Sequence, residues 1–178
     1  ETVLPLSPTQ EGMLFHALYE PGSWVYFDQI IVPISGDVNE SALFDAWRKV
    51  VARHQILRAG FIWEGVSKPI QVIMEQVELD IHRYDWSRFS QQEANEKVDR
   101  LLIDDRNMGF NFRRPNVMRL SWIVLPEGNF KLVWSFHHIL LDGWSMPVVF
   151  GELFTIYEDL VKQRETQLHQ PARYQDFI

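Results

Sequence analysis

A pair of strand-like runs in the second half of the chain restricts the possible folds more than any other feature. Residues 117–125 and 130–136 are both rich in β-branched and aromatic side chains, which is typical of strands. Between them lies Pro126-Glu127-Gly128-Asn129, a run of turn-forming residues. The pattern predicts a β-hairpin whose second strand leads directly into the adjacent residues His137 and His138.

Helix starts are marked along the chain by capping residues. Ser7 with Gln10 and Ser90 with Glu93 have the spacing of capping boxes, which predicts a helix after each serine. We also expect N-caps at Asn39 and Ser145, with the first helix ending at Pro21-Gly22 and the third near Arg106. The expected strands outside the hairpin are residues 26–34, 57–63, 70–74 and 79–84.

The alternation of strands and helices, with a hairpin among them, predicts an α/β layered lobe with a mixed sheet flanked by helices. Residues 1–162 contain the helices and strands described above and form the expected lobe. Residues 163–171 are polar and end in a proline, so that we expect a linker there, and residues 163–178 as a whole to form this linker and the start of the region that follows the lobe. Because residues 174–177 resemble the start of a new element, we expect the chain to continue beyond Ile178.

Composition excludes several classes of function. The net charge is −7, and no cluster of Lys and Arg forms the basic face that nucleic-acid binding requires. No apolar stretch is long enough to span a bilayer, and no signal peptide is visible. The lack of cysteine excludes disulfides, zinc–thiolate sites and cysteine nucleophiles, and we expect a cytoplasmic protein. Seven Trp and twelve Phe suggest aromatic packing, a ligand channel or a docking face.

The two histidines at the strand end carry the chemistry that the sequence offers. Adjacent residues of a strand point to opposite faces, so at most one of His137 and His138 lies in a given pocket. An imidazole at the mouth of a strand–turn–helix junction suits general base catalysis, because it titrates near neutral pH. Asp142 follows within the turn, and we expect Gly143 to provide a tight exit where a Cβ would be costly.

Other interpretations of these residues compete with a catalytic one. A lone histidine at a strand end is more often structural than catalytic. His138 and Asp142 have the i, i+4 spacing of two metal ligands on one helical turn, but Gly143 and the preceding strand argue against a helix there, and no third ligand is near. The sequence contains no Gly-x-Ser-x-Gly elbow and no glycine-rich phosphate loop. We therefore expect neither a metal nor a nucleotide.

Four runs of the sequence resemble, in order, the signatures of condensation domains of nonribosomal peptide synthetases. The run His137-His138-Ile139-Leu140-Leu141-Asp142-Gly143 resembles the active-site signature, whose His-x-x-x-Asp-Gly core is shared with chloramphenicol acetyltransferase. Residues 6–16, 53–61 and 174–177 resemble three further signatures. Phe136 and Ala59 depart slightly from the common pattern. The resemblance covers the whole chain and implies a chloramphenicol acetyltransferase-like fold.

The resemblance also implies a role for each residue of the site. His138 corresponds to the catalytic histidine, which would take the proton of the acceptor amine, position that amine or stabilise the tetrahedral intermediate. Gly143 would leave room beside it, and its N–H would assist the oxyanion. His137 would be structural. Asp142 would pair with Arg58 to hold the loop.

The implied reaction is amide formation between a donor aminoacyl or peptidyl thioester and the amine of an acceptor aminoacyl thioester. Both substrates would be carried on phosphopantetheine arms of carrier domains, beside an adenylation domain, and no cofactor would bind directly. The family has two lobes, and this chain resembles the N-terminal one, so we expect the isolated chain to be inactive. The wording of residues 10–16 resembles the subtype that accepts a D-configured donor.

Three alternatives remain open at this point. An epimerization domain or a coenzyme A-dependent acyltransferase would share the histidine signature. A non-catalytic lobe that docks a carrier domain would account for the aromatic residues without any chemistry at His138.

Overall fold

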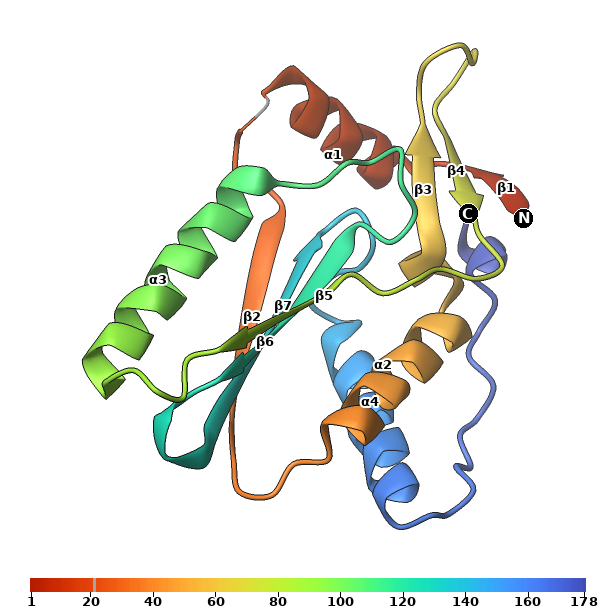
Figure 1. The fold of residues 1–178 in the computed structure, drawn as a ribbon. Helices are drawn as coiled ribbons and strands as arrows, with labels where there is room; N and C mark the ends of the chain where they lie inside the picture. Colours follow the sequence, from red (N-terminus) through yellow and green to blue (C-terminus); the bar gives the residue numbers. More distant parts are fainter. Residues whose placement is uncertain (21) are drawn as a thin grey trace.

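The computed structural model describes residues 1–20 and 22–178. A four-stranded sheet in the order β2-β7-β6-β5 lies beside a three-stranded sheet in the order β1-β4-β3 (Figure 1). In the larger sheet β5 pairs with β6 in parallel and the other pairs are antiparallel, which confirms the predicted mixed sheet. The strands are β1 (Thr2–Pro5), β2 (Phe27–Ser35), β3 (Ala59–Ile62), β4 (Ile70–Ile73), β5 (Ile81–Asp85), β6 (Met118–Val124) and β7 (Asn129–His137).

Helices begin where the capping residues predict. The capping boxes at Ser7 and Ser90 are both present, and the side chain of Asn39 accepts the N–H of Ala42. The first helix ends at Tyr19, and Pro21 of the predicted helix end lies outside the described residues. The α-helices are α1 (Pro8–Tyr19), α2 (Glu40–Arg53), α3 (Gln91–Met108) and α4 (Met146–Val161), and the 3₁₀ turns are η1 (Gln55–Arg58), η2 (Pro126–Gly128) and η3 (Tyr174–Phe177).

The structure differs from the expected strands at two places. Residues 55–58 form a 3₁₀ turn, so the strand expected from residue 57 begins only at Ala59. Residues 2–5 form β1, which was not predicted and pairs with β4. The second difference comes from a tertiary contact, since β1 is a four-residue strand that depends on a partner far away in the sequence.

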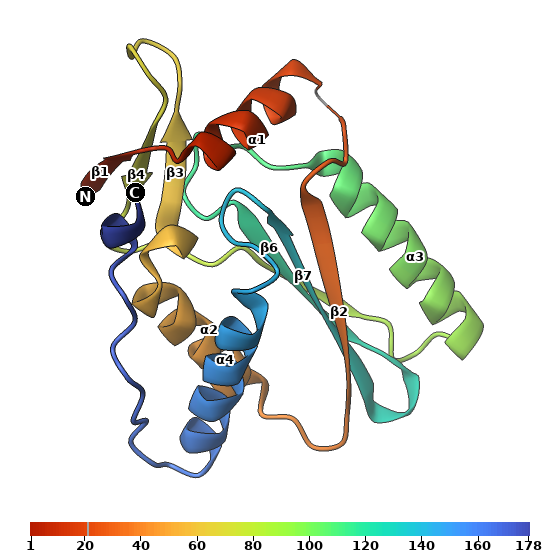
Figure 2. The same ribbon diagram turned by 180° about the vertical axis from the view of Figure 1, so that it is seen from behind.

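Helices cover both faces of the larger sheet. Helices α2 and α4 pack side by side on one face and α3 covers the other (Figures 1 and 2). On the first face Trp47 of α2 meets Trp134 of β7, with ring centroids 4.9 Å apart. Under α3, Ala94 and Val98 pack with Val133. Buried aromatic residues on one face and buried aliphatic residues on the other thus fix the sheet between two layers of helices.

A buried polar cluster joins α3 to the centre of the sheet. Arg119 of β6 forms an ion pair with Asp105 of α3, and both residues are less than 10 % exposed. Asp105 also accepts hydrogen bonds from Ser135 of β7 and from Gln29 of β2, the latter at 2.8 Å. A buried carboxylate is tolerated only when it is paired in this way, so these contacts hold α3, β2, β6 and β7 in one arrangement.

The segment after α4 lies along the lobe. Arg53 donates to the carbonyl oxygen of His169 at 2.6 Å, and the N–H of Tyr174 donates to Gln55. Leu168 packs against the main core. The segment that we expect to be a linker is therefore docked on the lobe here, and the division of the chain at residue 162 stays a prediction.

In the part of the chain that the structure describes, no helix is both long and apolar enough to cross a membrane.

Candidate active site

His137 is the last residue of β7 and His138 follows it directly. This end of β7 lies beside the start of β2 (Figure 2). In the antiparallel pairing of these strands Phe27 is opposite His137, and the N–H of His138 donates to the carbonyl oxygen of Tyr26 at 2.8 Å. The strand β2 therefore extends its hydrogen bonding past the end of β7 and fixes the backbone of both histidines.

His137 is buried on the α3 face of the sheet. Only 3 % of the residue is exposed, and its Nδ1 accepts the N–H of Ile139 at 3.1 Å. The ring meets that of Phe112 edge to face, with centroids 4.8 Å apart. Burial, with a smaller contribution from His138, lowers the pKa of His137 to about 4, so its ring is neutral at pH 7. These features favour the predicted structural role, which stays a prediction.

His138 faces the other way and is partly open to solvent. Its side chain is 28 % exposed, and the ring lies near that of Phe136. Nδ1 is 3.2 Å from the carbonyl oxygen of Leu141, and Nε2 is 2.7 Å from Oδ2 of Asp28. Of the two histidines, His138 is thus the one that a substrate can reach.

Asp28 belongs to the site although the sequence did not single it out. It lies opposite Phe136 in the β2–β7 pairing, and His138 comes two residues after Phe136 on the same face. Such diagonal neighbours across two strands are within reach of each other's side chains. The sequence predicts both strands but not their register, and the register is what brings Asp28 to His138.

The turn after His138 is closed by Asp142. Its Oδ1 accepts the N–H and the hydroxyl of Ser145, at 3.0 and 2.8 Å. The hydrogen bond from the Ser145 hydroxyl is the main cause that lowers the pKa of Asp142. Ser145 occupies the N-cap position of α4, but its hydroxyl donates to Asp142 and makes no capping bond to the helix. The expected capping by the Ser145 side chain was therefore wrong.

The expected pair between Asp142 and Arg58 was also wrong. Arg58 donates to the carbonyl oxygens of Val51, Ala52 and Met74, and no ion pair within the described residues joins it to Asp142. Val51 and Ala52 belong to the last turn of α2, whose carbonyl groups lack partners within the helix and attract a cation. Arg58 thus closes the end of α2, and Asp142 closes its own turn.

Gly143 plays no steric part in this turn. A Cβ added at Gly143 would meet no atom within 4 Å, and Gly143 is not among the glycines with positive φ. The expectation that this turn requires a glycine was therefore wrong. The open space beside Gly143 faces outward. Its neighbour Trp144 is 89 % exposed.

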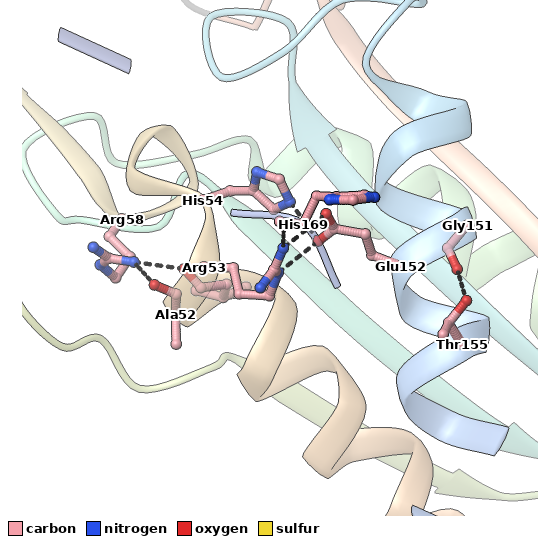
Figure 3. Close-up of polar contacts among 9 residues, drawn as sticks. Ala52, Arg53, His54, Arg58, Gly151, Glu152, Thr155 and His169 are labelled. Atoms are coloured by element: carbon pink, nitrogen blue, oxygen red, sulfur yellow. Dashed lines mark hydrogen bonds and ion pairs between the residues drawn. The ribbon is translucent and has the colours of Figure 1, made fainter. Parts of the chain in front are cut away.

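Arg53 and His54 tie the start of α4 to the end of α2. Arg53 Nε and His54 Nε2 lie 3.0 and 2.8 Å from Oε2 of Glu152. Figure 3 shows these contacts between α2 and α4. Burial alone would raise the pKa of Glu152, but the hydrogen bonds from Arg53 and His54 outweigh it and the pKa is lowered. The signature at residues 53–61 therefore orients α4, and with it the turn that follows His138.

The arrangement can accept or deliver a proton at His138 Nε2, beside a carboxylate and on an open face. Among the described residues no group of three His, Cys, Asp or Glu side chains is placed to hold a metal ion.

Comparison with known proteins gives one consistent family. The profile described as "Condensation domain" matches residues 1–178. A linear gramicidin synthase chain of Brevibacillus parabrevis is 40 % identical over 173 residues, and bacitracin synthase 3 of Bacillus licheniformis is 36 % identical over 178 residues. These alignments cover 97 % and 100 % of this chain but only 2 % and 3 % of those relatives.

Solved structures give the same fold. The starter condensation domain of rhizomide synthetase superposes with a TM-score of 0.88 at 16 % identity, covering 99 % of this chain and 44 % of that one. The first condensation domain of the calcium-dependent antibiotic synthetase, in complex with a substrate analogue, gives a TM-score of 0.83 at 20 % identity. That match covers 94 % of this chain and 40 % of the other.

The separate roles of Arg58 and Asp142 can be tested by a double-mutant cycle. We expect Arg58→Ala to lower the free energy of unfolding by about 1–2 kcal/mol, because three carbonyl groups lose a charged donor. Asp142→Ala should have a smaller effect, and the two changes should add to within about 0.5 kcal/mol. An interaction free energy well above that value, measured by urea denaturation, would show that Arg58 and Asp142 pair directly.

The buried His137 should make stability depend on pH. The folded chain keeps this ring neutral down to about pH 4, whereas the unfolded chain takes up a proton near pH 6.5. Stability is therefore greatest above pH 6.5 and falls as the pH decreases toward 4. We expect the wild type to lose roughly 2 kcal/mol more between pH 7 and pH 5 than His137→Phe, in urea melts at each pH. Equal losses in the two proteins would show that His137 does not titrate in this way.

Proposed function

This chain belongs to the condensation-domain family, and we propose that it is the N-terminal lobe of a condensation domain of a nonribosomal peptide synthetase. The intact domain would form an amide bond between a donor aminoacyl or peptidyl thioester and the amine of an acceptor aminoacyl thioester. The observation that carries this proposal is the position of His138, whose Nε2 lies at the end of β7 on an open face within a family match over residues 1–178.

The geometry at His138 suits this reaction. The contact of Nδ1 with the Leu141 carbonyl oxygen holds the ring with Nε2 directed outward, where it can take a proton from an attacking amine. A thioester is already activated, so positioning and charge stabilisation suffice for the chemistry. We propose that Gly143 leaves room for the substrate, since the space beside it is open, and that its N–H assists the oxyanion.

We propose that a second lobe completes the site. The chain spans less than half of the solved condensation domains that it matches. Large apolar side chains are exposed around α1, β2 and the turn before α4, as expected of a surface that packs against another lobe. They are Phe15, Tyr19, Trp24 and Trp144.

The substrates would reach this site on phosphopantetheine arms of donor and acceptor carrier domains, with an adenylation domain nearby in the same protein. The support is the set of peptide synthases among the relatives. That the protein acts in the cytoplasm and binds neither nucleic acid nor a membrane stays a prediction from the sequence.

The role of His138 can be tested in the intact domain. We expect His138→Ala to lower product formation from two loaded carrier domains by about 100-fold or more, which is the range of general acid–base catalysis. The melting temperature should change little, because the side chain is partly exposed. The control is His82→Ala on β5, which should keep full activity. If the His138→Ala domain formed product at the wild-type rate, an epimerization or docking role would have to replace this proposal.

The isolated chain of residues 1–178 should form no peptide bond. One wall of the site is missing if the second lobe completes it, so neither thioester is held against His138. The assay is product formation with two loaded carrier domains, and the intact domain serves as the positive control. Robust product from residues 1–178 alone would contradict the two-lobe site.

A further inference from the structure

Both ring nitrogens of His138 lie against oxygen atoms that accept hydrogen bonds. Nδ1 is 3.2 Å from the carbonyl oxygen of Leu141, which has no proton to donate. Nε2 is 2.7 Å from Oδ2 of Asp28, and an ionised carboxylate is likewise only an acceptor. Each contact is a hydrogen bond only when that nitrogen carries a proton, so the Leu141 carbonyl favours the proton on Nδ1 and Asp28 favours it on Nε2. The contact with Asp28 therefore occupies the nitrogen that would act as a base.

Asp28 is placed to meet a substrate as well as His138. Its side chain is 47 % exposed, and within the described residues Oδ1 makes no hydrogen bond to protein. The strand that carries it begins next to Tyr26, a non-glycine residue in the left-handed region with φ of 67°. Such backbone conformations cost free energy and persist where the surrounding structure holds them, often at functional sites. Tyr26 is held by the N–H of His138 itself.

We propose that Asp28 is a catalytic residue that binds the α-ammonium group of the acceptor aminoacyl thioester and holds its nitrogen beside Nε2 of His138, which accepts a proton from it. This inference rests on the proposed function and names a residue that recognises one of its two substrates. The free α-amino group has a pKa of about 8, so at neutral pH most of the acceptor arrives as a cation. One carboxylate balances one positive charge, so the arriving ammonium takes the place of the Nε2–H at Asp28, and the imidazole proton lies on Nδ1, bonded to the Leu141 carbonyl oxygen. The acceptor itself thus converts His138 into a base.

The proposed step conserves atoms and charge. The ammonium nitrogen gives one proton to the freed Nε2 and becomes a neutral amine. Its lone pair forms the C–N bond with the thioester carbonyl carbon, the C–S bond breaks, and the thiolate leaves with a proton. Of the two protons that nitrogen loses between ammonium and amide, one ends on the thiol, and the one taken up by Nε2 passes from there to water. Asp28 returns to His138 when the amide leaves.

The test compares two acceptors in the intact domain. One is an aminoacyl thioester of pantetheine, and the other is the matching hydroxyacyl thioester, which carries no positive charge. We expect Asp28→Asn to raise KM for the aminoacyl acceptor and to lower its kcat/KM roughly 10- to 100-fold, since a charged hydrogen bond is lost. KM for the donor, the melting temperature and the reaction of the hydroxyacyl acceptor should change little. Asp28→Glu, which keeps the carboxylate, should recover a large part of the loss.

Controls separate this inference from the proposed function. Asp37→Asn removes an exposed carboxylate in the loop after β2 and should leave both acceptors unaffected. If His138→Ala kept full activity, the proposed function would be overturned. If His138→Ala were inactive while Asp28→Asn kept its KM and kcat, only the role of Asp28 would fall. Equal losses with the two acceptors, or a Glu variant no better than Asn, would also overturn that role.

Discussion

The pairing of β2 with β7 is the constraint on which the rest of the site depends. Nine residue pairs join the two strands, from Phe27 opposite His137 to Ser35 opposite Asn129. A slip of one residue would turn every side chain of a strand to the other face. His138 would then exchange its open position for the buried one of His137. The register therefore decides which histidine is available for chemistry, and it also places Asp28 beside Nε2.

Several independent contacts hold this register. On one face Gln29 of β2 bonds to Asp105, the carboxylate that also pairs with Arg119 and Ser135. On the other face Trp134 of β7 packs against Trp47. The turn after His138 is then oriented from α4, whose Glu152 is held by α2. Removal of Arg119 or Asp105 would leave the other charge buried without a partner, which is strongly destabilising. The geometry of the site therefore depends on the stability of the whole sheet.

Local signals in the sequence predict much of this architecture. The capping residues Ser7, Asn39 and Ser90 mark helix starts because a cap acts within a few residues of itself. The hairpin is likewise set by its turn at residues 126–129. Contacts between distant segments carry no such signal. Neither β1 nor the pairing of Asp28 with His138 follows from the spacing of residues, since both depend on the register of strands.

The site also shows where resemblance and geometry differ. The motif residues Asp142 and Arg58 were expected to pair, but each is satisfied within its own neighbourhood by Ser145 or by the end of α2. The turn itself likewise does not require a glycine at residue 143, because a Cβ there would meet no atom within 4 Å. The absence of a side chain instead leaves the space outside the turn open. A motif thus identifies the important positions, whereas the contacts at each position have to be read from the structure.

The most direct test of the account is a crystal structure of the intact domain with a non-hydrolysable acceptor, an aminoacyl thioether of pantetheine. We expect the acceptor nitrogen to lie within about 3 Å of both His138 Nε2 and an oxygen of Asp28. The nitrogen would then stand between these two groups, on the open face at the end of β7. An acceptor amine bound away from His138, with the contact between His138 and Asp28 unbroken, would contradict the account.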